Sequence, residues 1–307
     1  MKKISENEII KIASKNNKFR EEVIVPIGED ASVLFPIQNS NIVITTDTMA
    51  LNTHFKNDIK PYELGYISAA SNISDLSAMG ATPAFALINL TLMDNSESYI
   101  SDLVNGYNSV FESFQISLIG GDTTYGQTSL TMTLIGYTSS NNHMLTSSSE
   151  INDTIFISGP VGSSLAALKE NKYNLPLMRN ELGNILPDFA NSCTDMSDGL
   201  LKSLKMIGDN SNLGFNIDLS KIEINKNTRD LLDNKKICWQ DILSYGEDYE
   251  LLFTVNNDKV IPLKNTCKNL GLEIFEIGNT IKSKEIIIYD GKKKLDLNIN
   301  QKFNHFK

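Results

Sequence analysis

The sequence predicts a two-domain protein made of both strands and helices, of the α+β or the α/β class. Its 307 residues are more than one ordinary core accommodates and fewer than three domains need. Strand-like and helix-like patterns alternate in both halves, and a stretch rich in Ser, Thr and Asn at 138–152 separates them. We therefore expect one domain at residues 1–140 and a second at residues 150–307.

The first half predicts an N-terminal amphipathic helix, followed by alternating strands and helices. Pro61 suits the first turn of a helix, Gly80 lies just past its end, and Pro83 prevents its continuation. The patterns also predict a helix at 98–114 and strands at 41–45, 84–92, 115–119 and 129–137.

The second half begins again with a strand, a glycine-rich turn and a helix. The turn, Gly159 to Gly162, is only a fragment of any phosphate-binding loop, so we interpret it as the connection between strand 154–158 and helix 163–170. Further along, the patterns predict a helix at 199–207, strands at 214–219 and 249–255, and a final pair of strands around 285–297.

Charge and composition narrow the classes of partner. A net charge of −9 gains nothing from counterion release on nucleic acid and repels anionic lipid, so we expect neither as a partner. The N-terminus has no apolar signal region, and the longest apolar stretch, 85–93, is far shorter than the ~20 residues of a membrane-spanning helix. The three cysteines stand far apart without a C-x-x-C pair, which is typical of reduced thiols in the cytoplasm. We expect a cytoplasmic protein.

Six aspartates share one setting, at the end of an apolar run beside Gly, Ser or Thr. Small neighbours let a ligand approach the backbone closely, and a strand end points its side chain toward the crevice where ligands bind. Alternatives remain open for single members, since one could cap the helix that follows it (Asp198) and another could belong to a turn (Asp122). The six are Asp30, Asp47, Asp75, Asp122, Asp195 and Asp198.

Asp75 is the most informative of the six. It lies near the C-terminal end of a predicted helix, where the helix dipole disfavours negative charge, and Asn72 stands three residues earlier on the same face. A bound cation would remove the penalty, and Mg²⁺ prefers oxygen ligands of this kind together with substrate phosphates. An acidic protein can therefore bind ATP through Mg²⁺ that lies between its carboxylates and the phosphates.

Missing motifs exclude several classes of enzyme. The sequence has no G-x-x-x-x-G-K-[ST] loop, no H-R-D or D-F-G motif and no G-x-S-x-G elbow. It is therefore not a P-loop enzyme, a protein kinase or an α/β-hydrolase.

An ordered series of motifs resembles the thiamine-monophosphate kinase family, within the superfamily of aminoimidazole ribonucleotide synthetase, selenophosphate synthetase and a hydrogenase maturation protein. The motifs run through most of the chain in the order GEDASVL, TTDT, SNISDLSAMGATP, GGDTT, DTIFISGPVGSSLAAL, DMSDGL, YGEDYELLFT, IGNTI and FNHF. The series as a whole is far more specific than any one motif. YGEDYELLFT and the C-terminal FNHF are similar to the thiamine-phosphate branch in particular.

The resemblance implies an α+β protein whose N-terminal mixed sheet forms a shared barrel in a homodimer, with a C-terminal α/β domain. It implies that ATP phosphorylates thiamine monophosphate to thiamine diphosphate with several Mg²⁺ ions. The implied Mg²⁺ ligands are Asp30, Thr45, Thr46, Asp47, Asp75, Asp122, Asp195 and Asp198. The implied ATP contacts are Tyr107, Gly121, Asp122 and Ser197, and the implied thiamine contacts are His54, Glu247 and Phe303.

No residue is assigned as a general acid or base, because a phosphate acceptor is already ionised at neutral pH. Compared with the family, Glu29 stands where an aspartate is usual, and Thr146 or a neighbour stands where an ATP-contacting arginine is expected. Other interpretations stay open: His54 without a special role, C-terminal aromatics that only pack, and an exposed turn at Glu247 and Asp248. The rival functions are an aminoimidazole ribonucleotide synthetase-like enzyme and a nucleotide-binding relative without activity.

Overall fold

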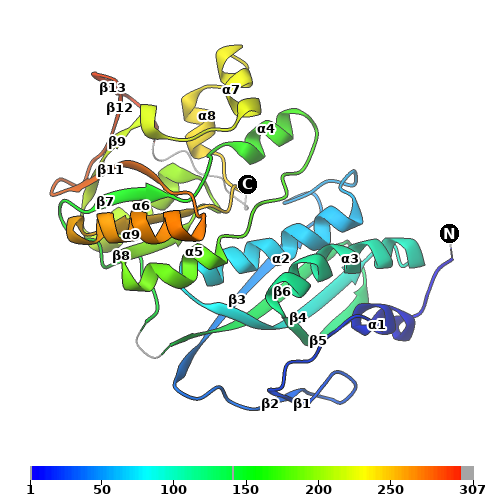
Figure 1. Ribbon diagram of the computed structural model, residues 1–307. Helices are drawn as coiled ribbons and strands as arrows, with labels where there is room; N and C mark the ends of the chain where they lie inside the picture. The colour runs from blue at the N-terminus through cyan, green and yellow to red at the C-terminus, as the bar shows by residue number, and fades with distance from the viewer. Residues whose placement is uncertain (1, 140–141, 299–307) are drawn as a thin grey trace. The chain divides into compact units, whose positions relative to one another are not determined.

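The computed structural model describes residues 2–139 and 142–298. Within them the chain divides into two compact units (Figure 1). The first, called here the N-terminal unit, falls within residues 1–76 and 81–141; the second, the C-terminal unit, falls within 77–80 and 142–307. Each unit has its own sheet and its own helices.

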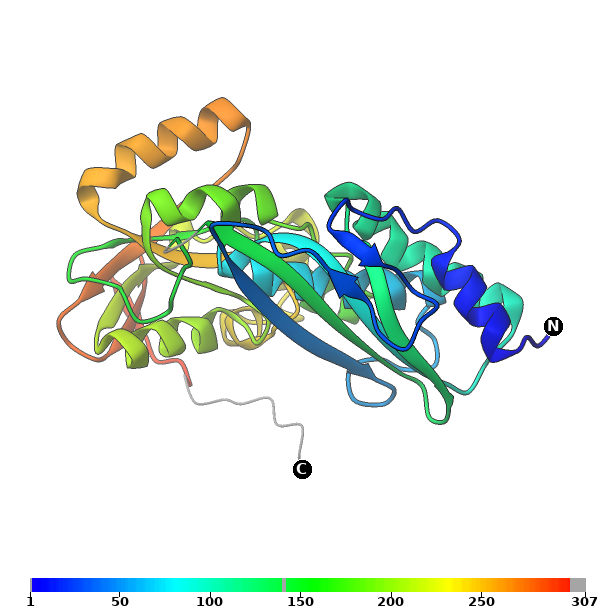
Figure 2. The same cartoon turned by 90° about the horizontal axis from the view of Figure 1, so that it is seen from below.

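The N-terminal unit is a four-stranded sheet with helices on one face. The strand order is β3-β6-β4-β5, with β4 and β5 parallel and the other neighbours antiparallel. Helices α2 and α3 lie side by side on one face of this sheet, as Figures 1 and 2 show. The elements are α1 (Glu6–Ser14), β1 (Val23–Val25), β2 (Val33–Leu34), β3 (Ser40–Ala50), α2 (Pro61–Ala78), β4 (Thr82–Leu92), α3 (Glu97–Phe114), β5 (Ser117–Tyr125) and β6 (Ser129–Ser139).

Strand β3 forms one edge of this sheet, and its side chains alternate between two faces. Thr45 points toward α2, because its hydroxyl donates a hydrogen bond to Asp75 of that helix. The opposite face of β3 carries Ile42 and Ile44, whose exposed fractions are 60% and 64%. An exposed apolar edge of this kind is unusual in an isolated domain.

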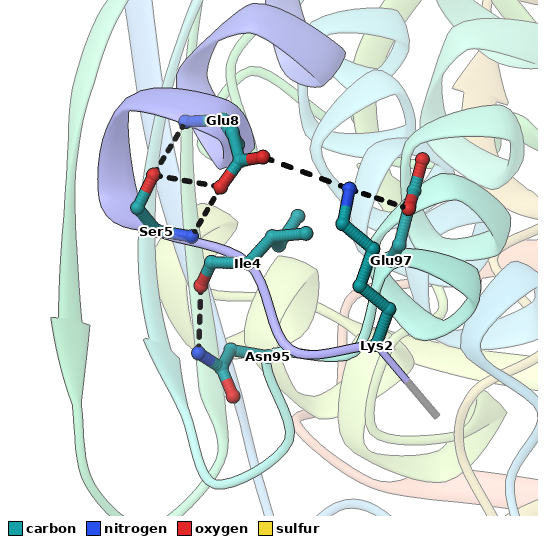
Figure 3. A network of polar contacts seen from close by, with 6 residues as sticks. All are labelled: Lys2, Ile4, Ser5, Glu8, Asn95 and Glu97. Atoms are coloured by element: carbon teal, nitrogen blue, oxygen red, sulfur yellow. Dashed lines mark hydrogen bonds and ion pairs between the residues drawn. The ribbon is translucent and has the colours of Figure 1, made fainter.

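Polar contacts at the N-terminal end of α1 attach it to the N-terminal end of α3 (Figure 3). Ser5 and Glu8 form a capping box, in which the Ser5 main-chain N–H donates to the Glu8 carboxylate at 2.8 Å. The Lys2 ammonium lies 3.7 Å from Glu8 and 3.2 Å from Glu97. The Asn95 amide also donates to the Ile4 carbonyl oxygen at 2.7 Å, so the helix start is fixed from two sides.

The C-terminal unit is a seven-stranded sheet, of order β13-β12-β9-β11-β7-β10-β8, between two layers of helices. Ile155 and Ile157 of β7 pack in the cluster that includes α6, while Phe156 packs on the other side with α5 and α9. The strands are β7 (Thr154–Ile157), β8 (Ala190–Asp195), β9 (Gly214–Asp218), β10 (Leu251–Val255), β11 (Phe275–Ile281), β12 (Ile286–Asp290) and β13 (Lys293–Leu295). The helices are α4 (Ser163–Lys169), α5 (Asn180–Ile185), α6 (Leu200–Ser211), α7 (Lys226–Asp233), α8 (Trp239–Ser244) and α9 (Asn257–Leu270), with short 3-10 turns at Leu186–Asp188 and Leu219–Lys221.

The description of this second unit as α/β is wrong in one respect. Among the described strands only β9 and β12 pair in parallel, and the other neighbours are antiparallel. Helices cover both faces, as in an α/β protein, but the chain does not reach each next strand by a right-handed crossover. Both units are therefore of the α+β type, in agreement with the fold class expected for the whole chain.

None of the helices within residues 2–139 and 142–298 combines the length and the apolar character that crossing a membrane requires.

Candidate functional site

A cavity of about 630 Å³ in the N-terminal unit gathers residues from four distant motifs. Its wall includes the 27–32 loop, strands β4 and β5, α3 and one side of α1. Of the residues expected to bind metal or ATP, four line this cavity: Asp30, Tyr107, Gly121 and Asp122. Its size lies within the range of small-molecule binding sites.

Two of the predicted metal ligands, Asp30 and Asp122, line this cavity, together with the carboxylate residues Glu6 and Glu29. The Ser32 hydroxyl donates a hydrogen bond to the Ile119 carbonyl oxygen, which holds the loop that bears Asp30 against β5. Asp122 lies within β5, paired with Asn89 of β4, so it is not part of a turn. Asp30 and Asp122 are both exposed, so their carboxylates can contact a polar ligand.

Gly121 occupies a position that only glycine fits. Its φ is +145°, and a Cβ there would lie 1.8 Å from the carbonyl oxygen of Ile88 on the parallel neighbour β4. The glycine beside Asp122 is therefore required by the close approach of β4 at this point.

Tyr107 lines the cavity from helix α3. Its ring is fully buried and lies 5.3 Å from that of Phe111, with the two planes tilted by 44°. The phenol oxygen is buried and has no hydrogen-bond partner among the described residues. A buried hydroxyl without a partner is unfavourable, so a ligand that contacts it would supply the missing hydrogen bond.

A second polar cluster joins strand β3 to helix α2. The Thr45 hydroxyl donates a hydrogen bond to the Asp75 carboxylate. The pKa of Asp75 is raised to about 6, mainly by burial and in part by the negative charge of Asp47, while the hydrogen bond from Thr45 opposes the increase. Burial also raises the pKa of Asp47, while a hydrogen bond from Ser71 of α2 opposes that shift.

His54 lies beside this second cluster. Its Nδ1 accepts a hydrogen bond from the Ala50 main-chain N–H at 3.1 Å, and its charge lowers the pKa of Asp47. The structure thus places His54 near Asp47, one of the predicted metal ligands.

Thr46 faces away from this cluster, as strand alternation requires. Its hydroxyl donates to the Met132 carbonyl oxygen at 3.2 Å and accepts from the Thr133 hydroxyl at 2.9 Å. The Thr46 side chain is therefore separated by the sheet from Thr45 and Asp75.

The predicted ligands of the N-terminal unit stand as two pairs of carboxylates. Within the part of the chain that the structure describes, no three His, Cys, Asp or Glu side chains converge as a metal site does. Asp30 and Asp122 share the cavity, and the charge of Asp47 acts on Asp75. Two carboxylates with hydroxyl or carbonyl oxygens suit Mg²⁺, which takes one or two carboxylates and completes its shell with phosphates and water.

The remaining predicted ligands belong to the C-terminal unit. Asp195 ends β8 and is 8% exposed, and Ser197 is exposed in the loop that follows. Asp198 is not a helix cap, since the cap of α6 is Gly199; its carboxylate instead pairs with the Lys202 ammonium one turn later.

The loop that bears Glu247 is partly buried. Glu247 is half-buried and Asp248 is only 4% exposed, so the interpretation as an exposed turn is wrong for Asp248. Burial raises the pKa of Asp248 to about 7, and the negative charge of Glu250 contributes to that increase. Phe303 lies outside the described residues.

The sequence interpretation missed a buried ion pair in this region. The Arg179 guanidinium donates two hydrogen bonds of 2.6 Å to the Glu250 carboxylate, and the Ser158 hydroxyl donates a third of 2.5 Å. Arg179 and Glu250 are 71 residues apart, so no local pattern reveals the pair. The available signal was a charged residue, Glu250, directly before a strand that is apolar apart from Thr254.

Comparisons with known proteins agree on one family. The AIR synthase related protein N-terminal domain matches residues 28–138, and the corresponding C-terminal domain matches residues 138–291. The thiamine-monophosphate kinase of Buchnera aphidicola subsp. Acyrthosiphon pisum (strain APS) is 32% identical, over 99% of this chain and 99% of its own length.

Solved structures give the same picture. The crystal structure of thiamine-monophosphate kinase from Stenotrophomonas maltophilia K279a has a TM-score of 0.82 and 30% identity, and the match covers 92% of this chain and 94% of that one. The structure of AaThiL complexed with AMPPCP and TMP has a TM-score of 0.74, with 94% of each chain covered; at 22% identity it supports the fold alone.

Proposed function

The chain belongs to the thiamine-monophosphate kinase family and is a kinase, and we propose that it transfers the γ-phosphoryl group of ATP directly onto the phosphate of thiamine monophosphate, with the help of several Mg²⁺ ions. The products are thiamine diphosphate and ADP. The thiamine-monophosphate kinases that share 30% identity or more with this chain support the acceptor, and AaThiL, which shares the fold, was solved with AMPPCP and TMP.

The observation that carries the proposal is the cavity of the N-terminal unit. Three residues from distant parts of the sequence line one cavity of about 630 Å³. They are Asp30 of the 27–32 loop, Tyr107 of α3 and Asp122 of β5. The apolar side chains in the cavity wall suit a nucleobase, and the carboxylates of Asp30 and Asp122 suit phosphates bridged by a metal.

The reaction requires positioning and charge neutralisation rather than proton transfer. The acceptor phosphate is ionised at neutral pH, so its oxygen attacks phosphorus without a general base, and ADP leaves on the opposite side. When bound, Mg²⁺ neutralises charge on the phosphates. The protein's part is to hold ATP and the acceptor in line, which accounts for the absence of any assigned catalytic acid or base.

We assign the metal ligands by unit. In the N-terminal unit they are Asp30, Thr45, Asp47, Asp75 and Asp122, with Thr46 contributing only its main chain because its hydroxyl is engaged on the other face. In the C-terminal unit they are Asp195 and Asp198, and Ser197 contacts ATP. The raised pKa of Asp75 supports its place in the set, because a desolvated carboxylate beside a second one gains most from a cation.

We assign the thiamine contacts to His54, Glu247 and Phe303. The position of His54 beside Asp47 supports its role, since the acceptor must approach the same metals. We also propose that the enzyme is a cytoplasmic homodimer. Exposed Ile42 and Ile44 on the edge strand β3 support pairing with a second copy, which would cover them.

Chromatography of one incubation tests the proposal. The purified protein is mixed with ATP, Mg²⁺ and thiamine monophosphate, and thiamine diphosphate is sought with and without EDTA. Product that disappears with EDTA supports the reaction, the acceptor and the metal together. Absence of product despite ATP binding would overturn the proposal and favour an aminoimidazole ribonucleotide synthetase-like enzyme or an inactive relative.

A further inference from the structure

Asp248 connects two loops of the C-terminal unit that lie more than 80 residues apart in the sequence. Its carboxylate accepts hydrogen bonds from the main-chain N–H groups of Gly162 at 2.6 Å and Ser164 at 2.9 Å. Gly162 is the N-cap residue of α4 and Ser164 lies in its first turn, where helix N–H groups have no partner within the helix. The glycine-rich turn before α4 is thus occupied by a side chain of the protein itself.

The Ser164 side chain extends the same connection to Glu247. Its hydroxyl donates to the Glu247 carbonyl oxygen at 2.5 Å and accepts from the Asn174 amide at 3.1 Å. Asp248 and Ser164 therefore fix the main chain on both sides of the Glu247 carbonyl, and with it the direction of the Glu247 side chain.

The segment so held is bound in turn to the loop between Asp195 and Asp198. The Glu247 main-chain N–H donates to the Ser197 carbonyl oxygen at 2.8 Å, and that of Tyr249 donates to Met196 at 3.3 Å. Contact is so close that a Cβ on Gly246 would lie 2.0 Å from the Ser197 carbonyl oxygen. Any movement of the 246–249 segment is therefore transmitted to Ser197.

The backbone of this segment is strained. Glu247 and Tyr249 adopt φ values of +64° and +54°, in the left-handed region that side chains other than glycine disfavour. Two such residues on either side of a buried carboxylate persist only where surrounding contacts enforce them, and such strain gathers at functional sites. Asp248 supplies the contacts that enforce it.

We propose that Asp248 is a positioning residue of the kinase, which acts through Glu247 by tying the first turn of α4 to the 246–249 segment. The inference rests on the proposed function, in which Glu247 contacts the thiamine portion of the acceptor. Asp248 itself is buried, and its carboxylate is engaged by the N–H groups of Gly162 and Ser164, so we assign it no contact with substrate.

A double-mutant cycle tests this route. Asp248→Asn replaces one accepting oxygen by an N–H₂ group that faces a main-chain N–H, so we expect kcat/KM for thiamine monophosphate to fall at least tenfold, mainly through KM. Glu247→Gln should show the same pattern, and the double variant should be within about threefold of Glu247→Gln alone. Losses that multiply in the double variant would mean that Asp248 does not act through Glu247.

A matched control separates positioning from general destabilisation. Asp153 is also buried, at 1% exposed, and also holds a turn by accepting from a main-chain N–H, that of Glu150 at 2.8 Å. Asp153→Asn should leave the KM for thiamine monophosphate within about twofold of the wild type. An equal rise in KM in both variants would contradict the inference. Should Asp248→Asn fail to fold, Ser164→Ala removes the bond to the Glu247 carbonyl alone and should raise the same KM.

Hydrogen exchange gives a readout that does not depend on activity. In Asp248→Asn, the amides of Glu247 and Tyr249 should exchange at least tenfold faster than in Asp153→Asn, because their segment has lost its anchor. Unchanged exchange would overturn the positioning role even in an active enzyme. If the wild type made no thiamine diphosphate while the exchange changed as expected, the proposed function would fail and the anchoring by Asp248 would stand.

Discussion

The hydroxyl of Thr45 donates a hydrogen bond to the carboxylate of Asp75, and this bond connects the edge strand β3 to the last turns of α2. The carboxylate is largely desolvated and lies within the field of Asp47, so its charge is unfavourable in the protein alone. The hydrogen bond from Thr45 offsets only part of this effect, since the pKa of Asp75 remains near 6. A cation at this place would offset the rest.

The variant Asp75→Asn tests the metal role. We expect turnover to fall at least ~100-fold, because losing a metal ligand removes several kcal/mol of charge stabilisation. The metal-free protein should unfold at the same temperature or higher, since a neutral amide replaces a disfavoured charge. Thiamine diphosphate formation and thermal melting measure the two effects. The control, Asp102→Asn, changes an exposed aspartate on α3 and should leave both unaffected; a near-normal rate in Asp75→Asn would refute the metal role.

The elements with apolar periodicity could be predicted from the sequence, and the polar ones could not. Strand β3 was expected at 41–45 but continues to Ala50, because its register with β6 extends through the polar residues Thr45 to Thr48. Backbone pairing does not require apolar side chains. Helix α9 was missed, and Pro262 within it is the reason, since proline argues against a helix interior.

The candidate site divides in the same way. The setting beside small residues at the end of an apolar run predicted Asp30 and Asp122, and the family resemblance added Gly121. The contacts of Asp248 and the ion pair of Arg179 join residues more than 70 positions apart, and only the fold brings them together. Local sequence patterns therefore do not predict such pairs.

The buried Asp248 should make stability depend on pH. Its pKa is about 7 in the folded protein against an ordinary 3.8, because burial and Glu250 disfavour its charge more than the N–H groups of Gly162 and Ser164 favour it. Between these two values the folded state keeps a proton that the unfolded state has lost, so this contribution to stability falls as pH rises from about 4 to about 7. Asp248→Asn lacks this proton. We therefore expect the melting temperature of the wild type, relative to the variant, to be higher at pH 5 than at pH 8. A difference that is equal at both pH values would contradict the raised pKa.

Tyr107→Phe tests whether the cavity of the N-terminal unit binds the nucleotide. The phenol oxygen has no partner among the described residues, so its removal should leave the free protein as stable as before or up to ~1 kcal/mol more stable. If the hydroxyl contacts bound nucleotide, the KM for ATP should rise about five- to tenfold, the value of one hydrogen bond. Melting curves and steady-state kinetics give the two numbers. Tyr99→Phe, on the same helix but outside the cavity, should not change the KM for ATP, and a Tyr107→Phe enzyme with an unchanged KM would place the nucleotide elsewhere.

Ile44→Lys tests the homodimer. Ile44 is 64% exposed on the outer strand of the N-terminal sheet, so a lysine there leaves the core intact but puts a charge on the face that we propose a second copy covers. We expect the wild type to run as a dimer in size-exclusion chromatography with light scattering, and Ile44→Lys to run as a monomer with an unchanged circular dichroism spectrum. Ile261→Lys is the matched control, because Ile261 is 70% exposed but lies on α9 of the C-terminal unit. A dimer that survives Ile44→Lys, or that Ile261→Lys disrupts equally, would mean that the β3 edge is not the interface.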